Sequence, residues 1–337
     1  MRNGILAGGN WIIDHVKRLD AWPAQDTLVS ILDQMSSNGG SPYNILKDLA
    51  RLGATFPLEG VGLVGDDANG RAILDDCRAH GIATGQMAVT SAAATSYTDV
   101  MTVQATGRRT FFHQRGANAH LDVEHFDFTR TQAKHFHLGY LLLLDRLDTI
   151  VDGQPRAVEV LKRAHAAGLT TSVDCVSETS ERFKSVILPT LPHVDVLFAN
   201  DFEAEKISGV ALRRDDVVDA VSVGRVARQL LSHGVRGWVV IHFPEAVYAC
   251  SAKGEGIWQP SVKVPREEIA GSAGAGDALA AGMLFGLLEG WPIKESLQLG
   301  VCAAALSLSH PTCSEGIRSA PECLLAGALR GYHSLPR

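Results

Sequence analysis

Short apolar runs alternate with amphipathic segments along most of this chain. The runs predict buried strands, and the segments between them, whose apolar side chains recur on one face, predict helices. We expect strands at residues 60–65, 169–174, 193–200 and 237–243, and helices at residues 66–81, 157–168, 201–209 and 223–234. Strands that alternate with helices are typical of βαβ units around a parallel sheet, so the pattern predicts an α/β fold.

The C-terminal part of the chain follows a different pattern. It is predicted to be helical from residue 277 onward, with a second buried helix at residues 300–309. No low-complexity linker, internal repeat or block of like charge interrupts the sequence. We therefore expect one domain that spans residues 1–337.

Two segments depart from the alternation of strand and helix. Residues 11–38 are too polar for a pair of core helices, and a proline interrupts them. Residues 95–118 predict a β-hairpin that turns at Thr106 and Gly107. Together the two segments predict a small sheet that projects from the main body as a lid.

The charge balance limits the classes of partner. The formal net charge is −6 and the isoelectric point is near 6.1. A nucleic-acid-binding protein needs a basic stripe, and an anionic membrane surface also attracts positive charge, so the composition argues against both partners. An anionic substrate stays open, because a local pocket can oppose the net charge.

Six cysteines lie far apart along the chain, at positions 77, 175, 250, 302, 313 and 323. None forms a CxxC pair, and no spacing of cysteine and histidine predicts a zinc site. We expect free thiols in a reducing compartment. The chain starts without the pattern of a signal peptide, and its apolar runs are too short to span a bilayer, so we expect a cytoplasmic protein.

The first candidate for chemistry is the sequence AGSAGAGDALAAGMLFG at residues 270–286. Gly274, Ala275 and Gly276 let a ligand approach the backbone closely. A helix expected to begin near Asp277 directs its free N–H groups and positive dipole end at them. Such a loop suits a phosphoryl group, and Asp277 stands where a carboxylate could take the proton of an attacking hydroxyl.

A simpler interpretation of this stretch is a glycine-rich turn in which Asp277 caps the helix. Two other phosphate-binding motifs are easily set aside. A Walker loop requires a Gly-Lys pair, and the chain contains none. A dinucleotide-binding fingerprint requires a third glycine where Leu279 stands and a buried strand before it, which argues against a Rossmann oxidoreductase.

A second candidate is the sequence NGGSPYNILKDLARLG at residues 38–53. Ser41 predicts the N-cap of a helix whose apolar face is buried. Gly39 and Gly40 again permit close approach of a ligand. Asn44, in the first turn, offers both a donor and an acceptor to a polyhydroxy substrate. The alternative is a well-capped helix after a turn.

Two further candidates are polar residues near strand ends. Asn200 and Glu203 follow the strand expected at residues 193–200, where an α/β sheet binds its ligands, and could organise magnesium (Mg²⁺) and its waters around a triphosphate. The alternative for this pair is a capping box. Asp14, at the edge of the expected lid, could hold two vicinal hydroxyls, although an exposed loop aspartate is otherwise ordinary.

Taken in order, these motifs resemble the ribokinase-like sugar kinases, also called the PfkB family. The resemblance runs from Gly8 to about Ile317. It rests on Asp14, Gly39-Gly40 with Asn44, GLVGDDANG at 62–70, RGANAHL at 115–121, NDFE at 200–203 and GAGD at 274–277. The last motif, which an Ala- and Gly-rich helix follows, is a fairly specific signature of the family.

The resemblance implies an ATP-dependent kinase that phosphorylates a hydroxymethyl group of a sugar or nucleoside. The implied fold is ribokinase-like, a mostly parallel sheet with helices on both faces and a small β-lid. Asp277 takes the position of the catalytic base. Gly274 and the backbone amides of Ala275 and Gly276 take that of the anion hole.

The resemblance also implies the binding residues and the partners. The sugar is expected at Asp14, Gly39, Gly40 and Asn44, and the nucleotide and its phosphates at Asn200, Glu203 and Ser272. Glu203 would act on Mg²⁺ through water. The implied partners are a small sugar or nucleoside and a second copy of the chain bound through the lid.

Three departures from the family pattern concern the nucleotide side. Gly271 and Ser272 stand where the family usually has Asp-Thr, and that Asp commonly helps to bind an activating monovalent cation, so potassium activation is doubtful. The sequence HFPEA at 242–246 replaces a Thr-x-Gly loop, and HPTCSEG at 310–316 replaces a late Gly-Ala loop. Nucleotide contacts in both loops must therefore differ.

These departures leave a second class of function open, a sugar- or nucleoside-binding protein of kinase ancestry that no longer transfers phosphate. Retention of Asp277 between small residues argues against it. Among kinases, a simple sugar is favoured over a nucleoside, without a choice of sugar.

Basic side chains add little to the choice of substrate. Arg108 and Arg109 in the hairpin could reach the carboxylate of a sugar acid, although such a pair is more often solvated. His113, His135 and His137 could line the pocket, but we expect structural roles for them.

Overall fold

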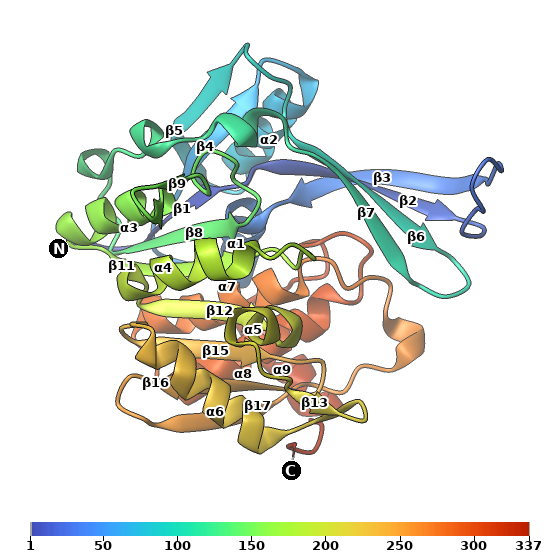
Figure 1. The fold of residues 1–337 in the computed structure, drawn as a ribbon. Helices are drawn as coiled ribbons and strands as arrows, with labels where there is room; N and C mark the ends of the chain where they lie inside the picture. The colour runs from blue at the N-terminus through green and yellow to red at the C-terminus, as the bar shows by residue number, and fades with distance from the viewer. Residues whose placement is uncertain (1, 337) are drawn as a thin grey trace.

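A nine-stranded sheet forms the centre of the computed structural model, which describes residues 2–336 (Figure 1). The strand order is β17-β16-β15-β12-β11-β8-β1-β4-β5. The strands are β1 (Ile5–Gly9), β4 (Leu58–Gly65), β5 (Ile82–Thr90), β8 (His135–Leu141), β11 (Thr170–Cys175), β12 (Val196–Asn200), β15 (Trp238–His242), β16 (Ala246–Ser251) and β17 (Gly256–Pro260).

The sheet is mostly parallel, as the alternation of strand and helix predicts. All neighbouring pairs from β5 to β15 are parallel, and only β16 and β17 run antiparallel to their neighbours. The carboxyl ends of the parallel strands therefore meet at one edge, where an α/β sheet binds ligands.

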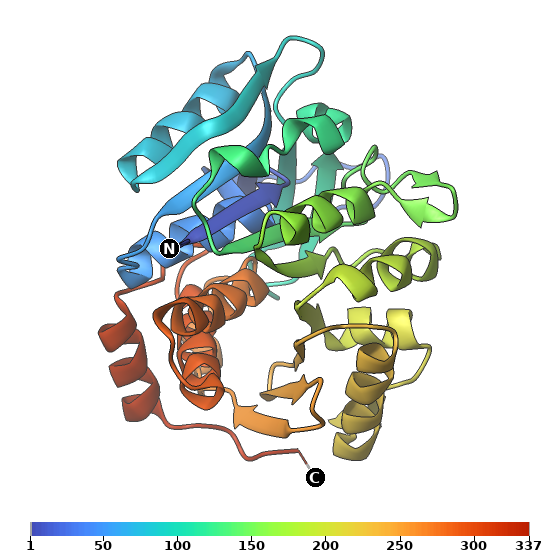
Figure 2. The ribbon, with the colours of Figure 1, turned by 90° about the vertical axis from the view of Figure 1, so that its left-hand side faces the viewer.

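Helices cover both faces of the sheet (Figure 2). One face carries α1 (Ser41–Leu52), α2 (Ala68–Ala79), α7 (Ala275–Glu289), α8 (Ile293–Ser307) and α9 (Ala320–Arg330). The other carries α3 (Ala157–Ala166), α4 (Leu188–Thr190), α5 (Asp201–Ser208) and α6 (Ala220–Ser232).

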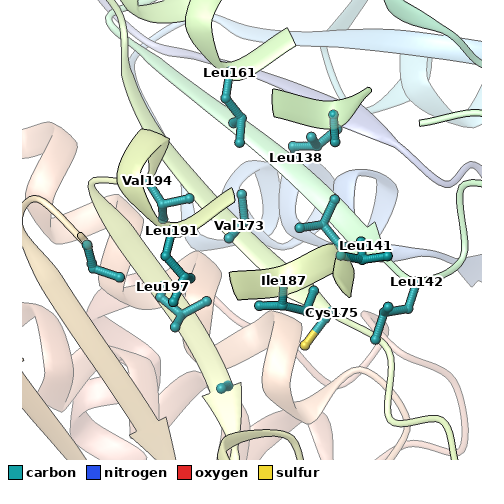
Figure 3. Packing of buried hydrophobic residues seen from close by; sticks show 14 of the residues in the cluster. Leu138, Leu141, Leu142, Leu161, Val173, Cys175, Ile187, Leu191, Val194 and Leu197 are labelled. Atoms are coloured by element: carbon teal, nitrogen blue, oxygen red, sulfur yellow. The ribbon is translucent and has the colours of Figure 1, made fainter. Parts of the chain in front are cut away.

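Each face has its own apolar core, because strands that are buried on both sides present apolar side chains in both directions. In Figure 3, Leu138, Val173 and Leu197 of neighbouring strands pack with Leu161 and Leu191 from the helical side. All five side chains are fully buried.

Small residues bring α7 and α8 close together on the opposite face. A Cβ atom on Gly282 would lie 2.7 Å from the Cα atom of Gly300, so only glycine fits where the two backbones meet. This contact holds the N-terminus of α7 close to the sheet, which matters because that N-terminus carries the candidate phosphate loop.

A second, four-stranded sheet has the order β3-β2-β6-β7 and projects to the right of the main body in Figure 1. We call it the lid sheet. Its strands are β2 (Ile12–Leu19), β3 (Ile31–Gly39), β6 (Tyr97–Val103) and β7 (Arg109–Gln114). The strands of residues 11–38 and 95–118 thus combine into one sheet, as predicted.

The lid sheet leaves apolar side chains exposed. Ile31, Leu32 and Met35 of β3 and Phe112 of β7 are between 37% and 51% exposed. The expected homodimer through the lid stays a prediction.

The smaller elements of the chain lie outside both sheets. They include two small two-stranded sheets. One pairs β9 (Ile150–Val151) with β10 (Gln154–Pro155), and the other pairs β13 (Arg213–Arg214) with β14 (Val217–Val218).

Three expected helix starts are wrong. Ser41 is not the N-cap of α1, because Gly40 takes that position with a φ of +84° and the Ser41 hydroxyl bonds to other side chains. Both α7 and α8 also begin earlier than expected. α7 begins at Ala275, two residues before Asp277, and α8 begins at Ile293, because both are buried over most of their length and lack a polar boundary.

The structure bears on two further expectations, free cysteine thiols and apolar runs too short to span a bilayer. All six cysteines are buried and form no disulfide. Among residues 2–336, every helix is too short or too polar to cross a membrane.

Candidate functional site

A cavity of about 860 Å³ lies between the lid sheet, the carboxyl ends of the central strands and the N-terminus of α7. Ten of the residues expected at the site line it: Asp14, Gly40, Asn44, Asn200, Glu203, Ser272, Gly274, Ala275, Gly276 and Asp277. The folding of distant segments thus collects the sequence candidates around one space, whose size is typical of a small-ligand site.

Asp277 lies in the first turn of α7 and is 4% exposed. Its Oδ2 accepts hydrogen bonds from Asn44 Nδ2 at 2.7 Å and from Tyr140 Oη at 2.6 Å. Burial, followed by the nearby charge of Asp174, raises the pKa of Asp277 to about 8. A carboxylate in this state accepts a proton readily once it is ionised.

The N-terminus of α7 has no side-chain cap. Gly274 is the N-cap residue, with a φ of +74° that favours glycine, so the interpretation of Asp277 as the cap is wrong. The Ala275 N–H makes only a 3.4 Å bond to the Ser272 carbonyl, and the helix supplies no acceptor for the Gly276 N–H. The first of these backbone donors is thus only weakly bonded and the second has no acceptor within the helix, so both can bind an anion.

Asp14 of the lid sheet stands on the same cavity, and it is 9% exposed instead of lying on an open loop. Burial raises its pKa to about 7, although hydrogen bonds from Thr98 and Cys313 act to lower it. Gly39 lies directly beside it, since a Cβ atom on Gly39 would stand 2.4 Å from Asp14 Oδ1. Glycine at this position therefore keeps the Asp14 carboxylate in its place.

A chain of buried amides continues from Asp277 toward the lid sheet. Asn44 donates to Asp277 and accepts a 2.6 Å bond from Asn38 Nδ2, which also donates to Ser314 Oγ at 2.8 Å. Asn38 and Ser314 are almost fully buried. The orientation of Asn44 is thereby fixed from both ends.

Asn200 and Glu203 form a capping box at the start of α5, as the simpler interpretation predicts. Asn200 Oδ1 accepts from the Glu203 N–H at 2.8 Å, and Glu203 Oε2 accepts from the Asn200 N–H at 2.9 Å. Glu203 Oε1 accepts from Ser177 Oγ at 2.7 Å. Burial raises the pKa of Glu203 to about 7. Both carboxylate oxygens therefore already have protein donors.

Two residues of the site were missed in the sequence. Tyr140 lies inside β8, directly before the apolar run at residues 141–144, and nothing in its local pattern distinguishes it. Asp174 stands at the carboxyl end of β11, so the rule for ligand crevices could have found it. Its Oδ2 accepts from Ser41 Oγ at 2.7 Å, whereas its buried Oδ1 has no hydrogen-bond partner among residues 2–336.

The donor set fits Mg²⁺ only in part. Residues 2–336 contain no group of three or more side chains that could hold a metal. Mg²⁺ commonly keeps several waters and binds one or two carboxylates together with substrate phosphates. The unpartnered Oδ1 of Asp174 beside Glu203 and Asp277 suits that arrangement, because a cation would offset the charge of three buried carboxyl groups.

A monovalent cation does not fit at Gly271, where the resemblance would lead us to expect one. A Cβ atom on Gly271 would lie 2.4 Å from Arg109 Nη2 and 2.8 Å from the carbonyl oxygen of His310. The guanidinium group of Arg109 thus stands where an acidic side chain would have to be. The doubt about potassium activation agrees with this geometry.

The three histidines divide into two groups. His135 and His137 share hydrogen bonds with Ser172 inside the sheet, and burial lowers the pKa of His135 to about 3, so they are structural as expected. His113 instead lines the cavity and bonds to Thr98 at 3.0 Å. Burial lowers the pKa of His113 to about 4, so it is neutral there.

Both loops that depart from the family pattern reach the cavity. His242, Phe243 and Pro244 border it from one loop and Cys313 from the other. Glu245 points elsewhere and forms two 2.9 Å bonds to Arg213. The loop around residue 244 therefore borders the cavity with two ring-bearing residues and a proline where the family has a glycine turn.

Comparison with known proteins gives the same family as the sequence motifs. The model of the pfkB family carbohydrate kinases matches residues 8–320. An ATP-dependent ribose-1-phosphate kinase of Halopiger xanaduensis is 29% identical over 323 residues, covering 94% of each chain. Fructokinase-1 of Oryza sativa subsp. japonica is 26% identical over 293 residues, covering 85% of this chain and 83% of the relative.

Solved structures show the same fold. The ribokinase of Arabidopsis thaliana, complexed with ribose and ATP, superposes with a TM-score of 0.75 at 18% identity. The superposition covers 97% of this chain and 99% of that one. The central sheet and its helices therefore have the ribokinase fold.

Proposed function

Because this chain belongs to the pfkB family of carbohydrate kinases, we propose that it transfers the γ-phosphoryl group of ATP to a hydroxymethyl group of a sugar or related polyol. The observation that carries the proposal is the buried Asp277 carboxylate, which stands at the uncapped N-terminus of α7 and bonds to Asn44 and Tyr140. A proton acceptor and an anion site are thus adjacent, as phosphoryl transfer requires.

In this proposal Asp277 is the general base. Its carboxylate takes the proton of the acceptor hydroxyl while that oxygen attacks the γ-phosphorus and the bond to the ADP oxygen breaks. Tyr140 and Asn44 both donate to Oδ2 of Asp277, which leaves Oδ1 to face the substrate. The two donors also hold the carboxyl plane in one orientation.

The backbone N–H groups of Ala275 and Gly276 form the anion hole in this proposal. They lie at the positive end of the α7 dipole, and Gly274 adds no side chain that could compete for them. Negative charge that develops on the transferred group is stabilised there without reorganisation, which is the condition for a large catalytic effect.

The acceptor site in this proposal is formed by Asp14, Asn44 and the backbone around Gly39 and Gly40. Asp14 accepts hydrogen bonds from two neighbouring hydroxyls, and Asn44 adds a donor and an acceptor. Both side chains line the cavity on the side of the lid sheet, so an acceptor bound there lies next to Asp277.

The donor site in this proposal lies along the rest of the cavity. Apolar side chains from the β17–α7 connection and from α8 offer faces for the adenine base: Val262, Val264, Val301, Ala304, Ala305 and Leu308. Ser272, Asn200 and Glu203 border the space for the phosphates. Bound Mg²⁺ would neutralise phosphate charge; Asp174 and, through water, Glu203 are the residues that would hold it.

The proposal is tested by ADP release in a coupled assay with ATP and Mg²⁺, across pentoses, hexoses, sugar acids, sugar phosphates and nucleosides. We expect turnover with one class of acceptor. No turnover on the whole panel, together with ligand binding in a thermal-shift assay, would contradict it and favour a binding protein of kinase ancestry. A nucleoside as the best acceptor would make the chain a nucleoside kinase instead.

A pH profile gives a sharper test of the base. A base works only when ionised, and burial raises the pKa of Asp277 to about 8, so kcat/KM should rise with pH and level off above about 8. Below that pH the protonated fraction grows, and kcat/KM should fall about tenfold per pH unit. The profile is measured with the best acceptor between pH 5.5 and 9.5.

Tyr140→Phe is the matched variant for this profile. The hydrogen bond from Tyr140 lowers the pKa of Asp277, so its removal should move the rising limb to higher pH. A profile that is flat across this range, or a limb that stays in place in Tyr140→Phe, would contradict the role of Asp277.

A further inference from the structure

Arg109 of the lid sheet faces the cavity side of its strand. Side chains alternate along a strand, so Arg109, Phe111 and His113 lie on the same face of β7, and Phe111 and His113 line the cavity. Arg108 precedes the strand and is exposed. Arg109 is not itself one of the residues that line the cavity, but of this basic pair it is the one on the face of β7 that borders the cavity.

The guanidinium group of Arg109 lacks an acceptor. Its Nε and Nη1 atoms are buried and have no hydrogen-bond partner, and no ion pair to Arg109 is found among residues 2–336. Burial lowers its pKa, while the neighbouring Cys313 and Asp14 act in the opposite direction. An unpaired buried cation is unfavourable unless a ligand supplies the missing anion.

Glycine at position 271 makes this arrangement possible. Any Cβ atom there would meet Arg109 Nη2 at 2.4 Å and the backbone of residues 310 and 311 at 2.8 to 3.0 Å. The guanidinium group therefore occupies a gap between the lid sheet and two loops of the main body, which limits its freedom to turn into solvent.

The surroundings of Arg109 belong to the acceptor half of the cavity. Asp14 is the site carboxylate whose charge acts on Arg109, and the effect is mutual. Thr98, which bonds to Asp14, also bonds to His113 on the Arg109 face of β7. An acceptor held by Asp14 would thus have the guanidinium group beside it.

We propose that Arg109 binds an anionic group carried by the acceptor, a carboxylate or a phosphate ester, and that this chain prefers such a charged sugar to its neutral counterpart. The inference rests on the proposed function and names the substrate class of the same site. A guanidinium group matches both anions with two parallel N–H donors, and the buried Nε and Nη1 atoms are free to bond.

The test uses matched pairs of acceptors and a matched pair of variants. D-ribose 1-phosphate is compared with D-ribose, and D-gluconate with D-glucitol, in wild type, Arg109→Gln and Arg108→Gln. We expect wild type to prefer the charged member of at least one pair, and the pair that responds distinguishes phosphate ester from carboxylate. In Arg109→Gln, the KM for that member should rise about 10- to 100-fold, and kcat should change little. Arg108→Gln should match wild type.

Binding without ATP separates this inference from the proposed function. Calorimetry with the charged acceptor alone should show the same loss of affinity in Arg109→Gln. If no acceptor is phosphorylated but this loss is seen, the proposed function fails and the anion site stands. Equal use of charged and neutral acceptors by wild type would overturn the inference. An equal fall of kcat for both members in Arg109→Gln would also overturn it, because Arg109 would then serve the transferred phosphoryl group.

Discussion

Asp277→Asn is expected to lower kcat with the best acceptor by about 10²- to 10⁴-fold, which is the usual contribution of a general base. The amide has nearly the same shape and can still accept the hydrogen bond from Tyr140 or Asn44. The change therefore removes the proton acceptor with little effect on the fold. Coupled ADP release at saturating ATP measures kcat, and thermal unfolding checks the fold.

Asp48→Asn is the matched control, since it replaces another buried aspartate by its amide. Asp48 lies on α1, its carboxyl oxygens have no hydrogen-bond partner among residues 2–336, and it does not line the cavity. Burial raises its pKa well above the usual range, and the amide keeps nearly the same shape. We expect kcat near wild type. An unchanged kcat in Asp277→Asn would contradict the mechanism.

Asp14→Ala is expected to lower kcat/KM by about 10²-fold or more, mainly through KM. Hydrogen bonds to a charged group contribute about 1.5–3 kcal/mol each, and Asp14 would hold two hydroxyls. The loss should be the same for charged and neutral acceptors, which distinguishes Asp14 from Arg109. Initial rates across a range of acceptor concentrations measure it.

Gly39→Ala tests the same site without changing its chemistry. The added Cβ atom would lie 2.4 Å from Asp14 Oδ1, so the carboxylate must move. We expect KM to rise in this variant too, with kcat less affected. If both variants leave KM unchanged, Asp14 does not bind the acceptor.

The cavity holds three buried carboxyl groups and has one guanidinium group near it. These groups suit a cation bound with the nucleotide and an anion on the acceptor. Burial raises the pKa of Asp14 and Glu203 to about 7 and that of Asp277 to about 8. In the proposed function, a divalent cation that binds with the nucleotide phosphates would favour ionisation of all three carboxyl groups. Arg109 adds the opposite charge at the acceptor end, where a substrate anion would complete the balance.

Local patterns were enough to predict much of the fold. Hydrophobic periodicity predicted the alternation of strand and helix, because each element has to bury one face or one stripe. The turn at Thr106 and Gly107 lies between β6 and β7, as expected, since the φ of +66° at Gly107 is one that glycine adopts readily. Helix starts were less predictable. The Ser41 hydroxyl, for example, bonds to His137 and Asp174 and therefore does not cap α1.

The sequence by itself determined the α/β class, the glycine loop before Asp277 and the order of motifs along the chain. These features depend on periodicity and on residues whose backbone preferences are local. Only the tertiary structure decided that Tyr140 and Asp174 adjoin Asp277. It also decided that Arg109 is near enough to Asp14 to feel its charge, while Arg108 is exposed. Those contacts join residues far apart in sequence, so their geometry depends on strand register and helix packing, which no local pattern encodes.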